Sequence, residues 1–403
     1  MTATAPALHT WLPNVDGFGR LVAPNDSQSV AATLADCVRD GQTVVPVGGG
    51  GALGLGNLTD PGALALSTLN LNQILSYEAT DMTLSVQAGV SLATIQGELG
   101  KQGQMLPIEA PHPETATIGG LLATALTGPR RYGGGTLRDV LIGIEVAYPD
   151  GTVGKAGGMV VKNVSGFDMM RLHYGALGTL GIITSANFKV LARPRAEVTY
   201  ISRPLPFAEA IDLGKQLRPL ENRPVALVIN RSEAGWTVSA RFEGRMSGLT
   251  AVESRIAPLF AEGITHAGPD SSEYWQEIMD NRAYTGEQVL RLQIGGRPAT
   301  ITSEARRIVD TLESKADTIR DCSVEPGLGQ ILVTLTEPLP SLETLRGLLG
   351  TDLTLRIHEA PLAYRQGIDI WGETPQTIDL MQRLRREYDP TPIINPGRFA
   401  GRL

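Results

Sequence analysis

The feature that most constrains this chain is a run of four glycines at residues 48–51, which follows a short apolar segment at residues 42–47. The segment QTVVPV predicts a buried strand. Successive glycines after a strand allow the backbone to turn several N–H groups toward one point, and such a nest binds an anion such as a phosphate. Taken alone, the run has a second interpretation, a flexible turn without a ligand.

The loop matches a dinucleotide-binding fingerprint only in the spacing of its glycines. Gly49, Gly51 and Gly54 have the spacing G-x-G-x-x-G that opens a Rossmann fold. That fold also needs a helix directly after the loop and an acidic residue about twenty positions further on. Residues 57–61 are turn-like and residues 63–77 contain no Asp or Glu. We therefore reject a nicotinamide-binding Rossmann domain.

Two further glycine-rich segments follow. Residues 113–120 (PETATIGG) lead into an apolar helix expected at 117–126, whose first N–H groups favour a phosphate. Residues 165–184 carry Gly175, Gly178 and Gly181, a spacing that lets a backbone approach something flat or bulky. Each segment alone also has a structural interpretation: a common helix start for the first, and close packing of two elements for the second.

The elements between these loops predict an α+β fold in three parts. The first part, residues 1–195, alternates helices with short strands. Its expected helices lie at 29–39, with Ser27 or Ser29 as N-cap, and at 91–99; its expected strands lie at 64–69, 82–87, 139–148 and 181–190. The second part, residues 196–372, has less glycine, with a hairpin at 226–230 and 236–242, a strand at 289–294 and a helix at 303–316. The third part, residues 373–403, contains a helix at 374–387 and a tail that we expect to dock, because a disposable terminus is normally polar and featureless.

Charge and cysteine content exclude several classes of protein. With 35 Lys and Arg against 42 Asp and Glu, the net charge is -7, which argues against a nucleic-acid-binding protein. Two cysteines, Cys37 and Cys322, cannot supply a four-cysteine zinc site or an iron–sulfur cluster. None of the five histidines is four positions from another, so we expect no metal.

Hydropathy suggests no segment that crosses a membrane. Apolar runs stay below the roughly 18 residues that span a bilayer, and the first residues lack the basic and apolar regions of a secretory signal. We therefore expect a cytoplasmic protein that meets the inner face of a membrane through partners alone.

Taken in this order, the glycine segments resemble the flavin-binding domain of the vanillyl-alcohol oxidase/p-cresol methylhydroxylase (PCMH-type) superfamily. The matching pieces are residues 46–51, 86–90, 116–120 and 175–184. Within that superfamily the chain is similar to the FAD-binding E subunits of bacterial glycolate oxidases, also called glycolate dehydrogenases, through residues 128–131, 138–139, 370–372, 380–385, 389–390 and 395–399. The resemblance implies an FAD-binding domain of two α/β subdomains and a cap-like α+β domain on the substrate side.

The resemblance also implies which residues bind FAD. The pyrophosphate would lie on Val47, Gly48, Gly49, Gly50, Gly51 and Ala52. The phosphate and ribityl region would lie on Pro113, Thr117, Gly119, Gly120 and Thr124. The adenosine part or the flavin would meet Gly178, Gly181 and Ile183, and Asn395 would bring the tail to the flavin. Some relatives carry a flavin-linked histidine where this loop has Gly51 and Ala52, so FAD is expected to be non-covalent.

No complete catalytic set is visible in the sequence. Oxidation of a 2-hydroxy acid needs a base for the hydroxyl proton and a cation for the carboxylate. Relatives that perform it carry Gly-His-x-Gly-Asp-Gly-Asn-x-His, which this chain lacks. The candidates are Arg130 and Arg131, which alternatively neutralise FAD or form surface pairs, and Arg356 and His358, whose strand face we expect to turn to solvent. His112 is expected to be a neighbour of the cofactor and not a base.

The function expected from the resemblance is that of an FAD-binding subunit of a glycolate dehydrogenase complex. Without cysteine ligands of its own, the chain would hold FAD and relay electrons, together with a catalytic flavoprotein D subunit and an iron–sulfur F subunit, in the oxidation of glycolate to glyoxylate. Two alternatives remain open. One is a self-sufficient FAD-dependent dehydrogenase of a 2-hydroxy acid or a sugar, and the other is a non-catalytic assembly subunit.

Overall fold

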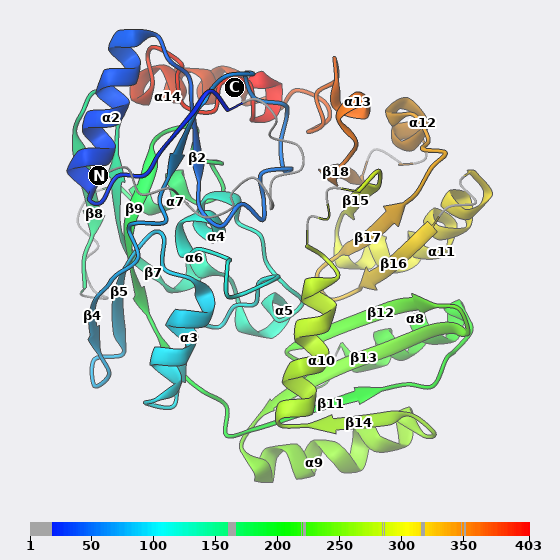
Figure 1. Cartoon of the computed structure of the whole chain (residues 1–403). Coiled ribbons are helices and arrows are strands. Elements are labelled where there is room, and N and C mark those ends of the chain that lie inside the picture. Colours follow the sequence, from blue (N-terminus) through cyan, green and yellow to red (C-terminus); the bar gives the residue numbers. More distant parts are fainter. Residues whose placement is uncertain are drawn as a thin grey trace.

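The structure, a computed structural model, describes residues 18–159, 167–218, 220, 223–283, 285, 287–315, 319–347, 349 and 352–403. The start of the chain, where a secretory signal was not expected, lies outside these residues, as do Ser165 and Gly166 of the third glycine segment. Figure 1 shows an amino-terminal region in blue to green beside a central region in green to orange. The α+β class predicted from the sequence is confirmed.

The amino-terminal region contains two main sheets. A three-stranded parallel sheet has the order β1 (Arg20–Val22), β3 (Leu64–Ser67), β2 (Val44–Val47). An antiparallel five-stranded sheet has the order β4 (Ile74–Glu78), β5 (Thr83–Gln87), β9 (Ile182–Lys189), β7 (Leu141–Ala147), β8 (Val153–Gly157). The short strands β6 (Gln104–Met105) and β10 (Leu191–Ala192) pair with each other. The helices are α2 (Ser27–Asp40), α3 (Leu92–Gly100), α4 (Ile118–Thr124), α5 (Arg131–Gly134), α6 (Leu137–Val140) and α7 (Met169–His173).

Helix caps explain where several of these elements begin. Ser91, the first residue of the helix expected at 91–99, caps α3. The expected cap of α2 at Ser27 or Ser29 is wrong, because the Asp26 side chain accepts the hydrogen bond from the Ser29 amide and both serines lie in the first turn. The strand expected from residue 139 begins only at Leu141, because Asp139 closes a capping box with Thr136 at the start of α6.

The central region is built on one antiparallel eight-stranded sheet. Its order is β14 (Ile264–Ala267), β11 (Ala196–Ile201), β13 (Gly235–Gly244), β12 (Ala226–Ser232), β16 (Ile319–Glu325), β17 (Gln330–Leu335), β15 (Leu290–Gly295), β18 (Thr354–Glu359). The expected hairpin is β12 and β13, and the expected strand and helix are β15 and α11 (Pro298–Lys315). The other helices of this region are α8 (Phe207–Leu217), α9 (Met246–Ile256), η1 (Ala257–Phe260), α10 (Pro269–Asp280), α12 (Leu342–Gly347) and α13 (Leu362–Arg365).

Alternation along the strands gives this sheet two different faces. Leu227 and Ile229 of β12 lie in the main core with residues of α8, α9 and α11. Ala226 and Val228 of the same strand instead pack against Trp275 of α10 on the opposite face. Figure 1 places α10 at the edge of the amino-terminal region, so this second face is the one that meets it.

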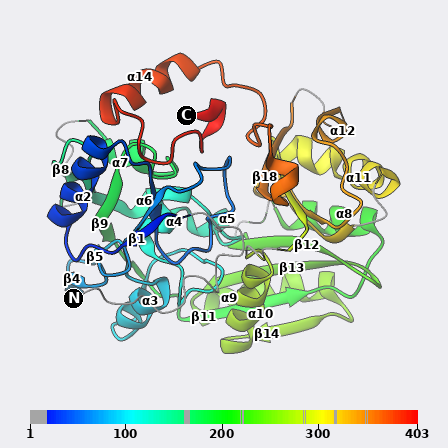
Figure 2. The same cartoon turned by 45° about the horizontal axis from the view of Figure 1, so that its top comes forward.

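The carboxy-terminal segment returns to the amino-terminal region. It contains α14 (Ile378–Tyr388) and ends in η2 (Ala400–Arg402), and Figure 2 shows it passing from the central region back to the start of the fold. Ile394 forms a parallel bridge with Val44, and Ile393 and Ile394 join the core around α2. The tail is therefore docked, as expected.

A buried histidine lies where α14 meets the amino-terminal region. His173 is 2% exposed, and its Nε2 is 3.1 Å from the Tyr148 hydroxyl. The His173 and Tyr388 rings meet edge to face, with their centroids 6.1 Å apart. Burial lowers the pKa of His173 to about 4. An imidazole whose pKa is depressed on folding contributes stability above its unfolded pKa of about 6.5, and this stability is lost as the pH falls toward the folded value.

We expect a His173→Phe variant to lose less stability than the wild type between pH 7.5 and pH 5.5. The phenyl ring keeps the aromatic packing but cannot titrate. The difference should be about 1 kcal/mol, from the linkage of one group with these two pKa values. Urea unfolding at the two pH values measures it, and parallel losses in both proteins would contradict the assignment of this group.

Candidate active site

A cavity of about 610 Å³ lies between the amino-terminal and central regions. Its walls come from the three glycine segments, the end of α10, strands β15 to β18 and the carboxy-terminal tail. Most residues predicted from the sequence as site residues line it, namely Val47, Gly48, Gly49, Gly50, Gly51, Ala52, Thr117, Gly119, Gly120, Thr124, Arg131, Gly178, Gly181, Ile183, Arg356, His358 and Asn395. Pro113 and Arg130 are not among the lining residues.

The first loop leaves β2 at Val47 and lies directly on the second loop. A Cβ on Gly48 would lie 2.2 Å from Thr117 Oγ1, and one on Gly49 would lie 1.8 Å from the Thr115 carbonyl oxygen. Gly50 has a φ of 82°, which L side chains rarely adopt. Glycine is therefore required at 48 and 49 for the contact between loops and at 50 for the turn, and the loop faces the cavity with bare backbone.

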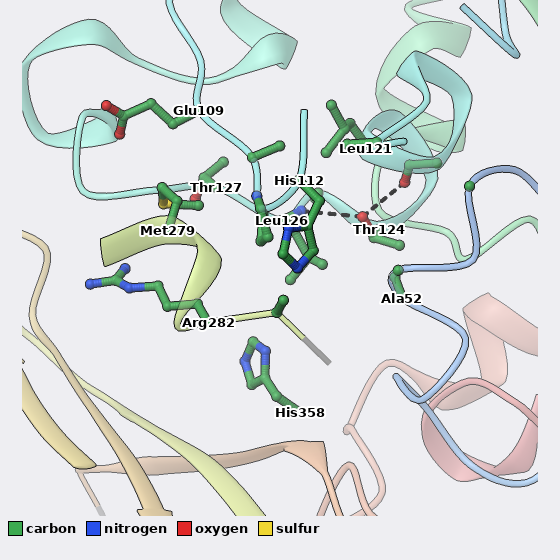
Figure 3. Close-up of a pocket in the computed structure, with 18 of the residues that line it drawn as sticks. Ala52, Glu109, His112, Leu121, Thr124, Leu126, Thr127, Met279, Arg282 and His358 are labelled. Carbon is green, nitrogen blue, oxygen red and sulfur yellow. Dashed lines mark hydrogen bonds between the residues drawn. The ribbon is translucent and has the colours of Figure 1, made fainter. Parts of the chain in front are cut away.

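The second loop ends in the short helix α4. Thr117 accepts the Gly120 amide at 3.4 Å, and Thr124 Oγ1 donates to the Gly120 carbonyl at 2.8 Å. Figure 3 shows Thr124 and Leu121 on this wall, with His112 beside them. Pro113 accepts the Ala93 amide through its carbonyl, at the start of α3 and away from the cavity.

The third segment meets the carboxy-terminal tail. A Cβ on Gly178 would lie 3.3 Å from Pro46 Cγ and 3.7 Å from Asn395 Nδ2. Asn395 Nδ2 donates to the Leu177 carbonyl at 2.6 Å. The tail thus fixes the third segment against the strand that leads into the first loop.

Arg398 is a site residue that the sequence reasoning did not single out. Its guanidinium donates to the carbonyl oxygens of Ala52, Leu53 and Leu55 at 3.0–3.1 Å. It is 5% exposed, and burial together with nearby Arg365 lowers its pKa to about 10. Arg398 therefore holds the end of the first loop, and its place in the terminal stretch at 395–399 was the available signal.

The opposite wall is formed by the edge of the central sheet. Arg356 and His358 lie on β18 and line the cavity. Arg356 is exposed, as expected for a face that turns to solvent, whereas His358 is half-buried. The Arg356 guanidinium lies 5.5 Å from the centre of the Trp371 ring. Burial, followed by the charges of Arg356, Arg291 and Arg282, lowers the pKa of His358 to about 3, so its imidazole is neutral.

Arg130 and Arg131 occupy different environments. Arg130 Nη2 donates to Glu243 Oε2 at 2.6 Å, and both side chains are at most 10% exposed. Arg130 is therefore paired with a buried carboxylate of this protein. It neither neutralises FAD nor forms a surface pair, the two alternatives that the sequence suggested. Arg131 begins α5 and lines the cavity.

Arg131 and Arg356 bring two cations from different regions to one cavity. After burial, the charge of Arg131 is the cause that lowers the pKa of the Arg356 guanidinium. In the described part of the chain, neither guanidinium has a carboxylate within ion-pair distance. Both residues are exposed to solvent, and two guanidinium groups without a carboxylate partner in one cavity can bind an anionic ligand.

The site thus combines bare backbone loops with a cationic wall. The loops fit the pyrophosphate of a dinucleotide, since no Cβ separates their amides from the cavity and a residue larger than glycine is sterically excluded at 48 and 49. Among the described residues no cluster of His, Cys, Asp or Glu could hold a metal ion, and no helix is long and apolar enough to cross a membrane. Fold and loops together define a domain that fits a dinucleotide such as FAD.

Comparison with known proteins agrees. Residues 19–157 match the family described as FAD binding domain, so this part of the chain is an FAD-binding domain and the expected cofactor is confirmed. The glycolate oxidase subunit GlcE of Escherichia coli (strain K12) is 34% identical over 212 residues, which are 52% of this chain and 56% of GlcE. The D-lactate dehydrogenase of Anaerostipes hadrus is 33% identical over 181 residues, 45% of this chain and 38% of that protein. The chain thus matches about half or less of the length of these relatives.

The likeness in structure extends further than the likeness in sequence. A solved structure of alkyldihydroxyacetonephosphate synthase superposes with a TM-score of 0.65 and covers 93% of this chain and 75% of its own, at 18% identity. This shows that the central region shares the fold as well.

We expect acid to release the flavin. The first loop has Gly51 and Ala52 in place of a linking histidine, and FAD held by backbone contacts is lost when the protein unfolds. Trichloroacetic acid should leave a colourless pellet and a yellow supernatant. A yellow pellet would mean a covalent link, and His112, which lines the cavity, would be the first residue to replace.

Proposed function

We propose that the chain is the FAD-binding subunit of a complex that oxidises a small 2-hydroxy acid, with glycolate to glyoxylate as the reaction. The observation that carries this proposal is the pair Arg131 and Arg356, which faces the FAD-binding loops across one cavity without a carboxylate partner in the described residues. Glycolate is suggested by the relative GlcE, whose name is that of a glycolate oxidase subunit.

In this proposal the two arginines bind and orient the substrate carboxylate. A guanidinium presents parallel N–H donors that match a carboxylate, and such pairs fix orientation as well as position. FAD, when bound, supplies the acceptor for the hydride equivalent of the oxidation. The neutral imidazole of His358 stands next to Arg356 on the same strand face and adds a group that can take part in hydrogen bonds to the substrate.

The partners in this proposal are a catalytic flavoprotein D subunit and an iron–sulfur F subunit. Both cysteines of the chain, Cys37 and Cys322, are buried, and burial raises the pKa of the Cys322 thiol to about 12. Neither suits a metal–sulfur centre, so electrons would leave FAD through another subunit. The complex would act on the cytoplasmic side, and its partners would make any contact with the inner face of the membrane.

A second candidate is a self-sufficient 2-hydroxy-acid dehydrogenase. It is favoured by the convergence of Arg131, Arg356 and His358 in this single chain. The sequence argument against it is the missing histidine-rich motif, since loss of a general base typically costs about 10²–10⁴ in rate.

Anaerobic stopped-flow absorbance distinguishes the two candidates. The FAD-loaded chain is mixed with saturating glycolate, alone and together with the two partner subunits. We expect slow or no bleaching of the flavin alone and turnover with an added acceptor in the full complex. Bleaching of the lone chain within seconds would favour the self-sufficient enzyme, and no turnover in the full complex would refute the first proposal.

We expect an Arg356→Gln variant to raise the KM for glycolate about 10- to 100-fold, because hydrogen bonds to charged groups contribute about 1.5–3 kcal/mol. FAD content should not change, since Arg356 lies on the wall opposite the glycine loops. Arg306→Gln is the matched control, because this exposed arginine pairs with Asp310 on α11. An unchanged KM in the first variant would exclude Arg356 from the carboxylate site.

A further inference from the structure

A chain of hydrogen-bonded side chains leads from a buried carboxylate to His358. Glu325, at the end of β16, is fully buried. Its Oε1 accepts a hydrogen bond from Arg282 Nη2, and its Oε2 accepts one from Gln330 Nε2 at 2.7 Å. Gln293 Nε2 donates to Gln330 Oε1 at 2.6 Å, and Gln293 Oε1 lies 2.8 Å from His358 Nε2.

The buried carboxylate sets the direction of every bond in this chain. An ionised carboxylate can only accept hydrogen bonds, and Glu325 forms an ion pair with Arg282. Gln330 must therefore turn its NH₂ group to Glu325 and its oxygen to Gln293. Gln293 in turn donates to that oxygen and presents its own oxygen to His358. Neither amide can flip without bringing two donors or two acceptors together.

The last bond determines which nitrogen of His358 carries the proton. The depressed pKa keeps the imidazole neutral, so it has one N–H group. Because Gln293 offers an oxygen, the proton lies on Nε2, and Nδ1 keeps its lone pair. Figure 3 shows the ring of His358 directed toward the segment that carries Arg282, with His112 beyond it, and all three residues line the cavity.

Nδ1 and the two arginines therefore offer complementary groups to one ligand. Arg356 lies two residues from His358 on the same face of β18, and guanidinium groups can only donate hydrogen bonds. A ligand that satisfies all three must carry an anion for the arginines and a hydrogen-bond donor for the imidazole. A 2-hydroxy acid carries both on adjacent carbon atoms.

We propose that Nδ1 of His358 accepts a hydrogen bond from the substrate hydroxyl group and so distinguishes 2-hydroxy acids from acids that lack this group. The inference rests on the proposed function, because it takes the carboxylate to be bound by Arg131 and Arg356. Gln293, Gln330 and Glu325 are positioning residues that act through the tautomer of His358.

The tautomer can be measured directly. Histidine-selective ¹⁵N labelling of the FAD-loaded chain gives spectra in which the protonated and the unprotonated ring nitrogen differ in shift and in coupling to the ring protons. A His358→Asn sample identifies the signals of this residue. We expect one stable tautomer with the proton on Nε2 from pH 6 to pH 8. A proton on Nδ1, rapid exchange between tautomers, or titration in this range would overturn the inference.

Ligand selectivity tests the consequence. Calorimetric titration of the FAD-loaded chain with glycolate and with acetate, which lacks the hydroxyl, should give a preference for glycolate of roughly three- to tenfold, the range expected for one hydrogen bond. His358→Phe should abolish the preference. His358→Asn should retain part of it, because its amide oxygen can take the place of Nδ1. Gln330→Leu should reduce it by releasing Gln293.

The matched control for Gln330 is Gln276→Leu. Gln276 donates to the Ala110 carbonyl and to Asp280 beside the cavity without lining it, so this variant should keep the preference. Equal affinity of the wild type for both acids, or a preference that survives in His358→Phe, would overturn the inference while leaving the carboxylate site intact. Binding of neither acid would instead refute the proposed function, and with it the role of Nδ1.

Discussion

Replacement of Gly50 by valine is expected to give a folded protein that no longer retains FAD. Gly50 has a φ of 82° and lines the cavity. A β-branched side chain in this conformation costs about 1–3 kcal/mol of backbone strain, and its bulk would stand where the cofactor must approach the bare backbone. The absorbance of flavin relative to protein after purification measures the loss, which should be nearly complete.

The control for strain alone is Gly62→Val. Gly62 has a φ of 87°, and a Cβ placed on it would meet nothing within 4 Å. Both variants should therefore lose similar stability in urea unfolding, while only Gly50→Val loses its colour. If Gly50→Val purifies as yellow as the wild type, the first loop does not bind the cofactor.

The glycine loops could be predicted because their signal is local. A run of glycines after a strand permits the close turns of a backbone nest, and Gly48 and Gly49 are required by contacts with a loop that the sequence already identifies. Even here the reason for each glycine differs. Gly50 needs a positive φ, whereas Gly49 needs room for the Thr115 carbonyl oxygen, and sequence alone does not separate the two causes.

The cationic wall could not be predicted because its polarity has two interpretations. On β18, Leu355 and Ile357 face the core of the central region, so alternation correctly places Arg356 and His358 on the other face. A polar strand face is most often solvated, and nothing in the local pattern shows that it also lines a cavity. The residues that share this cavity come from segments more than two hundred positions away, such as Arg131 of α5.

Long-range ion pairs could not be predicted either, because their partners lie far apart in the sequence. Arg130 was expected to meet a ligand or the surface, and its partner Glu243 lies 113 positions away in the chain. Both belong to a buried cluster with Arg241, Glu109 and Glu197. Two residues come from the amino-terminal region and three from the central region, so the cluster joins the two walls of the cavity.

Replacement of Arg241 by methionine should destabilise the protein by about 3–5 kcal/mol, the usual result of removing one partner from a buried ion pair. The guanidinium of Arg241 contacts Glu109 at 2.5 Å, Glu197 at 2.6 Å and Glu243 at 3.2 Å, and its side chain is 5% exposed. Without it, three carboxylates share Arg130 alone. Urea unfolding measures the loss, and Arg39→Met, which breaks an exposed pair with Asp36, should cost less than about 1 kcal/mol.

The pH dependence separates this electrostatic cause from a simple loss of packing. Burial already raises the pKa of Glu243 in the wild type, and removal of Arg241 should raise it further in the folded state. The folded variant then binds more protons than the unfolded chain near pH 6, so its stability rises as the pH falls. We expect the difference in the free energy of unfolding between the variant and the wild type to become smaller from pH 7.5 to pH 5.5. A constant difference would mean that the aliphatic part of the arginine side chain, and not its charge, holds the two regions together.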